Sequence, residues 1–265
     1  MKKLIILLLA LLGILIGCSH EEILEYNMFY RYENNEYIDI NFYKNGSEEN
    51  ANDILCLIDY WNTMLDHEHV NDTKNNLAAL NVNKYATLDA KLVELIEYTI
   101  DLSTSYKVVN PLYGTLKDLW DLHMITEELP TENECLTQIE VSLSTRVAIN
   151  DNDVHLLGDG LIDLDYIKKG FIGEKIKEYL ISKGIDRYVI NYNADLVLYG
   201  KNKNGGSFET SFYGMKNGTY NLSDITLARV TADNNCFYTK DGRRWADIPS
   251  FVTGVPNDTF ETLFV

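Results

Sequence analysis

Residues 162–171 read Ile-Asp-Leu-Asp-Tyr-Ile-Lys-Lys-Gly-Phe, so a strand-like segment leads directly into a helix-like one. The first amides of a helix are unpaired, and the helix dipole favours negative charge there. Lys169 would add a positive donor, Gly170 would allow close approach of a ligand, and Asp163 could accept a hydrogen bond from a base or sugar. The segment therefore predicts an anion site, with a capped surface helix without a ligand as the alternative.

The histidines and cysteines give weaker signals. His67 and His69 are two residues apart near the end of a predicted helix, which directs them to different faces. We therefore predict no metal site from this pair. Three widely spaced cysteines without a CxxC pair are interpreted as buried structural thiols rather than zinc ligands or a disulfide framework. They are Cys56, Cys135 and Cys236.

The N-terminus has the pattern of a targeting signal. Two lysines precede thirteen almost continuously apolar residues, 4–16. This length spans about 20 Å as a helix, short of the roughly 30 Å hydrocarbon core, and therefore predicts a secretory signal. The segment ends in a sequence that resembles a bacterial lipobox, with an ordinary signal peptide as the alternative. We expect residues 1–17 to be a lipoprotein signal peptide, and Cys18 to carry lipid. Residues 18–25 would then tether the protein to the outer face of the cell membrane.

Charge and composition restrict the possible partners. The chain has 40 acidic against 23 basic residues and a net charge of −17. This excess argues against nucleic acid, whose phosphates require basic surface, and against a body that lies flat on anionic lipid. Membrane contact is expected through the lipid anchor only. No linker-like stretch divides residues 26–265, which we predict to form one domain.

The elements that must position these residues follow an α+β plan, with helices concentrated in the first half and a mostly antiparallel sheet in the second. Ser47 and Thr131 have the sequence pattern of helix N-caps. Further helices are predicted at residues 87–106, from Pro111 to 122, and at 166–183, with a short helix and then a loop within 72–83. Strands are predicted at 26–32, 37–43, 146–149, 154–157, 161–164, 188–190, 196–199, 208–213, 225–230, 236–238 and 261–265.

The segment 163–171 resembles the DLGGIAKGY motif of the FAD:protein FMN transferases, the ApbE family of lipoproteins. Other landmarks follow in that family's order across nearly the whole chain after the tether. Met28 stands where the family has its Met-Gly-Thr strand, residues 110–120 resemble DPTVGPL…LW, 190–195 resemble INxGGD, and 241–256 resemble DGKRY…TGYP.

The resemblance implies a reaction and a set of site residues. FAD would be split at its pyrophosphate, and FMN transferred to a threonine of an acceptor flavoprotein of an electron-transfer system, with Mg²⁺ neutralising phosphate charge. By resemblance, Asp163 and Lys169 contact FAD, and the Tyr166 main-chain oxygen helps to hold Mg²⁺. Trp120 and Ile248 would line the flavin pocket. The remaining flavin-binding positions implied are Met28, Gly170, Asn191, Thr253 and Gly254.

Departures from the family pattern leave two hypotheses open. The paired glycines of GGD are Asn193 and Ala194, and residues 247–251 lack the histidine and aspartate of the family's HIIDP. The family continues to an ADxxxT helix with Mg²⁺ ligands, whereas this sequence ends at Val265. The chain is therefore expected to be either an FMN transferase in which other groups replace these ligands, or a non-catalytic lipoprotein that binds flavin weakly or serves as an interaction module.

Overall fold

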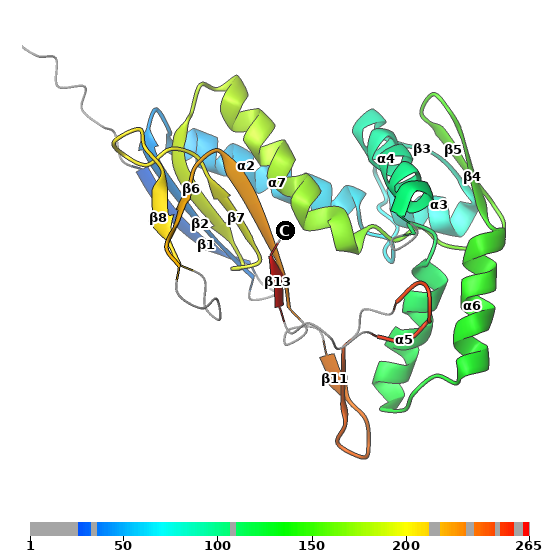
Figure 1. Cartoon of the computed structure of the whole chain (residues 1–265). Coiled ribbons are helices and arrows are strands. Elements are labelled where there is room, and N and C mark those ends of the chain that lie inside the picture. The colour runs from blue at the N-terminus through cyan, green and yellow to red at the C-terminus, as the bar shows by residue number, and fades with distance from the viewer. Residues whose placement is uncertain are drawn as a thin grey trace, which may run out of the picture.

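A computed structural model describes residues 26–32, 36–106, 110–211, 218–231, 236–246, 250–256 and 262–264. Sheet strands with two long helices lie on one side of the molecule, and most of the remaining helices lie on the other (Figure 1). This mixture of helices and antiparallel sheet confirms the predicted α+β class. None of the helices in the described residues is long and apolar enough to cross a membrane.

The main sheet has six strands in the order β1-β2-β6-β7-β10-β13, and every neighbouring pair is antiparallel. The predicted hairpin at its edge is confirmed. Alternation in β2 buries Ile38, Ile40 and Phe42 on one face, as expected for a half-buried strand. The bounds are β1 (Tyr26–Arg31), β2 (Tyr37–Lys44), β6 (Arg187–Tyr192), β7 (Leu196–Tyr199), β10 (Ile225–Thr231) and β13 (Thr262–Phe264).

Two helices, α2 (Glu48–Met64) and α7 (Asp165–Ser182), lie beside this sheet (Figure 1). The Ser47 N-cap of α2 is confirmed, because its hydroxyl accepts a hydrogen bond from the Asn50 amide at 3.3 Å. The predicted end of α7 is also confirmed. Gly184 lies two residues beyond the helix with φ +68°, a conformation that glycine adopts readily.

The other half of the molecule contains four helices and a small sheet. The predicted capping box at Thr131 is confirmed, since the Glu134 side chain accepts from the Thr131 amide at 2.7 Å. The helices are α3 (Leu77–Asn83), α4 (Ala90–Tyr106), α5 (Gly114–Thr126) and α6 (Glu132–Ser144). The sheet has the order β3 (Tyr85–Thr87), β5 (Asp153–Leu157) and β4 (Arg146–Asn150). Two short hairpins complete the fold: β8 (Phe208–Thr210) with β9 (Tyr220–Leu222), and β11 (Cys236–Tyr238) with β12 (Arg244–Ala246).

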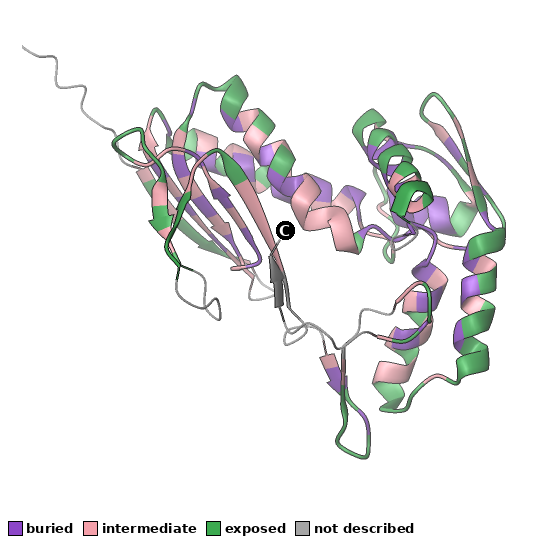
Figure 2. Cartoon of the chain, in the orientation of Figure 1, coloured by how far each residue is buried: buried purple, intermediate pink, exposed green. Residues whose placement is uncertain are grey.

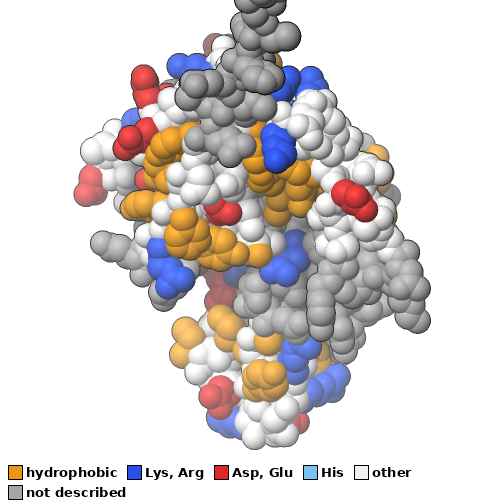
Figure 3. Space-filling view, turned by 90° about the vertical axis from the view of Figure 1, so that its left-hand side faces the viewer, with side chains coloured by type: hydrophobic (Ala, Val, Ile, Leu, Met, Phe, Trp, Pro, Cys, Tyr) orange, Lys and Arg blue, Asp and Glu red, His pale blue; other side chains and the backbone are white. Residues whose placement is uncertain are grey.

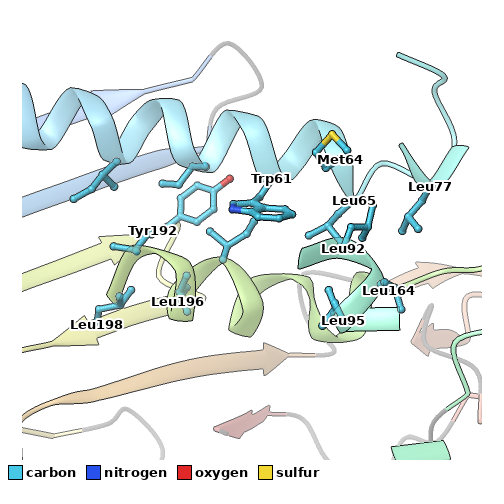
Figure 4. Packing of buried hydrophobic residues seen from close by; sticks show 14 of the residues in the cluster. Trp61, Met64, Leu65, Leu77, Leu92, Leu95, Leu164, Tyr192, Leu196 and Leu198 are labelled. Atoms are coloured by element: carbon cyan, nitrogen blue, oxygen red, sulfur yellow. The ribbon is translucent and has the colours of Figure 1, made fainter. Parts of the chain in front are cut away.

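One buried apolar cluster joins the two halves. It runs from Leu196 and Leu198 in the main sheet past Trp61 to Leu77 and Leu92 in the helical half (Figure 4). Trp61 and Phe171 connect α2 to α7 through an edge-to-face contact with ring centroids 4.7 Å apart. Figure 2 shows buried residues in the main sheet, in α2 and α7, and in the helices of the other half. On the face drawn in Figure 3, acidic and basic side chains are interspersed with apolar ones, so the charge there is mixed.

Three expectations about local structure were wrong. The strand predicted at residues 161–164 does not form, because the main chain of Ile162 is hydrogen-bonded to the side chain of Asn81 rather than to a neighbouring strand. Within residues 72–83 the loop comes first and helix α3 follows, the reverse of the predicted order. Cys56 is exposed rather than buried, because it lies on the outer face of α2.

Candidate functional site at the start of helix α7

The turn before α7 is fixed by a side chain from α3. The Asn81 side chain accepts a hydrogen bond from the Ile162 amide at 2.8 Å and donates one to the Ile162 carbonyl at 2.9 Å. The Asp163 amide donates to the carbonyl of Pro111 at 2.9 Å. These three bonds hold the segment in place between α3 and the start of α5, and they aim Asp163 into the protein.

Asp163 is completely buried, and only one of its carboxylate oxygens has a partner. Its Oδ1 accepts a hydrogen bond from the Asp165 amide at 2.7 Å, whereas its Oδ2 has no partner among the residues that the structure describes. Burial raises the pKa of Asp163 to about 6, and the neighbouring charge of Asp165 adds to the effect. A buried acceptor without a partner is costly, so this oxygen is a candidate ligand atom.

His67, from the loop after α2, faces the same point. Its Nε2 lies 3.9 Å from Asp163 Oδ2, and its Nδ1 lies 3.9 Å from Asp165 Oδ1. One atom from each of the three side chains lies within 4.8 Å of the other two, which is a geometry that could hold a metal ion. The sequence did not identify His67 as part of a site, because it approaches Asp163 only in the folded chain. His69, its neighbour two residues on, points away and is exposed.

Lys169 lies one turn further along α7 and contacts Asp195. Its Nζ is 2.6 Å from Asp195 Oδ2, while Arg229 Nη2 lies 3.2 Å from Asp195 Oδ1. Asp195 is buried, so it holds both cations in fixed positions. The segments 163–171 and 190–195, which were singled out separately in the sequence, therefore meet in space. Together, the two cations and one anion leave a net positive charge.

A cavity of about 540 Å³ opens beside this turn. Its volume is in the range of small-molecule sites. It brings together the start of α7, the end of α2 and the last residue of β6. The lining residues are Glu36, Asn62, Thr63, Asp66, Asp165, Lys168, Lys169, Ile172 and Tyr192.

Trp120 and Gly254 meet in a second, aromatic cluster. Trp120 is 2% exposed, and its Nε1 donates to the carbonyl of Gly254 at 2.8 Å. Its ring packs against Phe237 and Trp245 at centroid distances of 6.0 and 6.3 Å. Gly254 has φ +72°, and an added Cβ would lie 2.6 Å from the Cβ of Cys135. Only glycine fits this position.

The remaining predicted site residues are dispersed. Met28 packs against the main core from β1, and the Asn191 side chain accepts from the Ala194 amide at 2.9 Å. Gly170 lines a separate cavity of about 500 Å³, and Thr253 is exposed. Ile248 and Cys18 lie outside the described residues.

Tyr166, for which a metal-binding main-chain oxygen was expected, is the second residue of α7. A carbonyl there is directed along the helix toward the amide four residues on. The centroid of its ring lies 5.9 Å from that of Tyr113, and its buried hydroxyl has no hydrogen-bond partner within the described part of the chain. The contacts of Tyr166 in the structure are therefore those of a packed aromatic side chain.

Asp163→Asn is expected to remove a pH dependence of stability. The pKa of Asp163 is raised in the folded protein, so folding favours its protonated form. This contribution is complete below about pH 4 and is lost as the pH rises through about 6. At about 1.4 kcal/mol per pKa unit, the loss is about 3 kcal/mol. Urea unfolding of the parent and the variant at pH 4 to 8, in the presence of a chelator, measures how the free energy of unfolding changes with pH. The exposed Asp159→Asn should follow the parent, and parallel curves for Asp163→Asn and the parent would contradict the prediction.

Comparison with known proteins identifies the family. The sequence pattern of the ApbE family matches residues 37–261. The ApbE protein of Thermotoga maritima has a similar structure, with a TM-score of 0.74, 15% identity and coverage of 91% of this chain and 81% of that one. The flavinyl transferase ApbE of Pseudomonas stutzeri, in its apo form, has a TM-score of 0.72 and 12% identity, with coverage of 91% of this chain and 80% of that one. The flavin transferase ApbE of Vibrio cholerae has a TM-score of 0.68 and 16% identity, with coverage of 91% of this chain and 81% of that one. No curated protein sequence matches. Because the family pattern covers most of its length, this chain belongs to the ApbE family.

Proposed function

We propose that this chain is an FAD:protein FMN transferase that acts as a lipoprotein, anchored through Cys18 and facing outside the cytoplasm. It would take FMN from FAD and attach it to a threonine of an acceptor flavoprotein. The observation that carries the proposal is the meeting of Lys169, Asp195 and Arg229 beside the cavity at the start of α7, in a chain of the ApbE family.

The cations at this site are suited to a diphosphate. Asp195 holds the ammonium of Lys169 and the guanidinium of Arg229 in position before any ligand arrives. Donors that are fixed in advance need little reorganisation as negative charge develops on phosphate oxygens. Lys169 and Lys168 both line the cavity, so an entering phosphate would meet positive charge on one wall. These residues would bind and orient FAD.

The carboxylates at the start of α7 fit a divalent cation. Asp163 has a buried oxygen without a partner, and Asp165 lines the cavity. Carboxylate oxygens and substrate phosphates are the ligands that Mg²⁺ prefers, whereas the His67 nitrogen is not. Asp163 and Asp165 would hold Mg²⁺, which would neutralise charge on the phosphate oxygens.

The transfer balances without an external oxidant or reductant. The threonine oxygen forms a bond to the phosphorus of the FMN half, and the bond between that phosphorus and the bridging oxygen breaks. AMP leaves, and the hydroxyl proton is released. Non-catalytic flavin binding is the second candidate. The observation that favours it is that Asp247 and Ser250 stand where the family's HIIDP has its histidine and its aspartate.

The test uses the full chain in mild detergent with FAD, Mg²⁺ and a peptide that carries the target threonine. A transferase will add the mass and fluorescence of FMN to the peptide and release AMP in equal amount. A peptide with alanine in place of the threonine is the control and should stay unmodified. FAD binding without AMP release or labelling would establish the non-catalytic candidate instead.

A further inference from the structure

The two edges of the main sheet differ in length and in protection. All six residues of β1 pair with β2 without a bulge, whereas β13 at the opposite edge has three residues. Among the residues that the structure describes, no strand pairs with the outer side of β1. Soluble proteins usually protect such an edge by shortening it or by adding lysine, proline or a bulge. β1 has none of these features, so its main chain can accept a further strand.

The side chains of β1 are self-complementary around Met28. The strand reads Tyr-Asn-Met-Phe-Tyr-Arg, so Tyr26 and Tyr30 lie two residues to either side of Met28, on the same face of the sheet. Tyr26 and Met28 pack against the main core, whereas Tyr30 is 45% exposed. In an antiparallel pair of two such strands centred on Met28, each Tyr26 would face Tyr30 of the other copy. The apolar row would then continue across both copies, with cross-strand aromatic pairs of a kind that stabilises sheets.

The charge in β1 also favours antiparallel pairing. Arg31 is the charged residue of this strand, and pairing centred on Met28 keeps the two copies' Arg31 about 20 Å apart along the strands. A parallel pair in register would place the two guanidinium groups side by side, where like charges are destabilising.

We propose that β1 pairs with β1 of a second copy of this chain, antiparallel and centred on Met28, so that the two main sheets join into one. Such a contact is isologous, as in most soluble homodimers. Its twofold axis is perpendicular to the joined sheet, so the α2 and α7 helices of both copies lie on the same face. One pair of edge strands is smaller than a standard interface, so the dimer is expected to be weak in solution.

The lipid anchor would strengthen this dimer, and this one argument rests on the proposed function. The two Tyr26 residues would lie about 13 Å apart along the paired strands. The eight residues 18–25 can span up to about 26 Å from each of them. Both anchors could therefore enter the same bilayer, where tethering raises the effective concentration of one copy near the other.

Sedimentation equilibrium of the full chain in mild detergent, at increasing protein concentration, tests the dimer. We expect the parent to pass from the monomer mass to the dimer mass. Phe29→Lys places a lysine on the edge strand, near its own counterpart in the other copy, and should raise the dissociation constant at least tenfold. The matched control is Ile125→Lys, because Ile125 lies on α5 and is 80% exposed. The control should form the dimer as the parent does.

Cysteine cross-linking tests the register. In a chain with Cys56→Ser, which removes an exposed thiol, Met28→Cys should form an intermolecular disulfide. The two Cα atoms at this position would face each other at about 4.5–5.5 Å, within the range of a disulfide. Tyr30→Cys is the control, because its two Cα atoms would lie at least about 13 Å apart, which is too far for a disulfide.

The proposal is overturned if the parent stays monomeric up to its solubility limit, if Phe29→Lys forms the dimer as readily as the parent, or if Tyr30→Cys cross-links as well as Met28→Cys. Circular dichroism shows whether each variant is folded, and a misfolded Met28→Cys would leave Phe29→Lys and its control as the deciding pair. These samples contain neither FAD nor acceptor, so their outcome is separate from that of the FMN transfer assay.

Discussion

Lys169→Gln will weaken FAD binding about 10- to 100-fold, because a hydrogen bond from a charged donor contributes about 1.5–3 kcal/mol. Lys169 lines the cavity, and its ammonium is already held in position by Asp195. The change removes the charge but leaves Asp195 with Arg229 as a partner, so the buried carboxylate is not left unpaired. Flavin fluorescence quenching with the full chain measures the dissociation constant.

The matched control for this experiment is Lys175→Gln on the same helix. Lys175 pairs with Glu178 at 2.8 Å, so its loss removes one lysine from α7 without changing the pair of Lys169 with Asp195. FAD affinity should change less than twofold in the control. Equal FAD affinity in Lys169→Gln and the parent would remove this lysine from the site, and with it the main support for a diphosphate pocket.

Trp120→Ala will lower the free energy of unfolding by about 3–5 kcal/mol, the usual cost of removing a large buried aromatic side chain. Trp120 is 2% exposed, packs against Phe237 and Trp245, and donates to the carbonyl of Gly254. Its removal would leave a cavity and an acceptor without its donor. Urea unfolding followed by circular dichroism measures the loss.

Two further variants separate the contributions of Trp120. Trp120→Phe keeps much of the packing but removes the indole donor, so we expect a loss of about 1–2 kcal/mol. Leu122→Ala, two residues along the same helix and 58% exposed, should change stability by less than about 0.5 kcal/mol. A loss below 1 kcal/mol for Trp120→Ala would show that the aromatic cluster is not a structural core.

Local signals predicted most of the fold because they depend on neighbouring residues. The caps at Ser47 and Thr131 and the glycine after α7 act within one helical turn, and the structure confirms all three. The segment 161–164 was misassigned for the opposite reason. Ile162 is bonded to a side chain from α3, and Leu161 and Asp163 are bonded to the main chain of residues 111–114. An apolar run does not show whether its partner will be a strand.

The site was predicted only in part. The sequence marked the turn at residues 163–171 as an anion site, and the structure places Lys169 beside a cavity. The sequence could not show that Asp195 would bind this lysine, or that His67 would approach Asp163, because both contacts join distant segments. The site therefore combines charged side chains from segments that are far apart in the sequence.

Replacement of the family's paired glycines has a local cost. Asn193 and Ala194 have φ of +54° and +55°, and Ala194 is a non-glycine residue in the left-handed region. This conformation costs alanine about 1–2 kcal/mol. The hairpin between β6 and β7 tolerates it, since the turn is closed by the bond from the Ala194 amide to Asn191.

The two hydrogen bonds from Asn81 to Ile162 imitate, with one side chain, the pairing that a strand would provide. The position of Asp163 relative to His67 is thereby coupled to the placement of a seven-residue helix in the opposite half of the molecule. Tilting or shifting α3 would displace the carboxylate. Redesign of that helix, even for solubility alone, would then alter the chemistry at the start of α7.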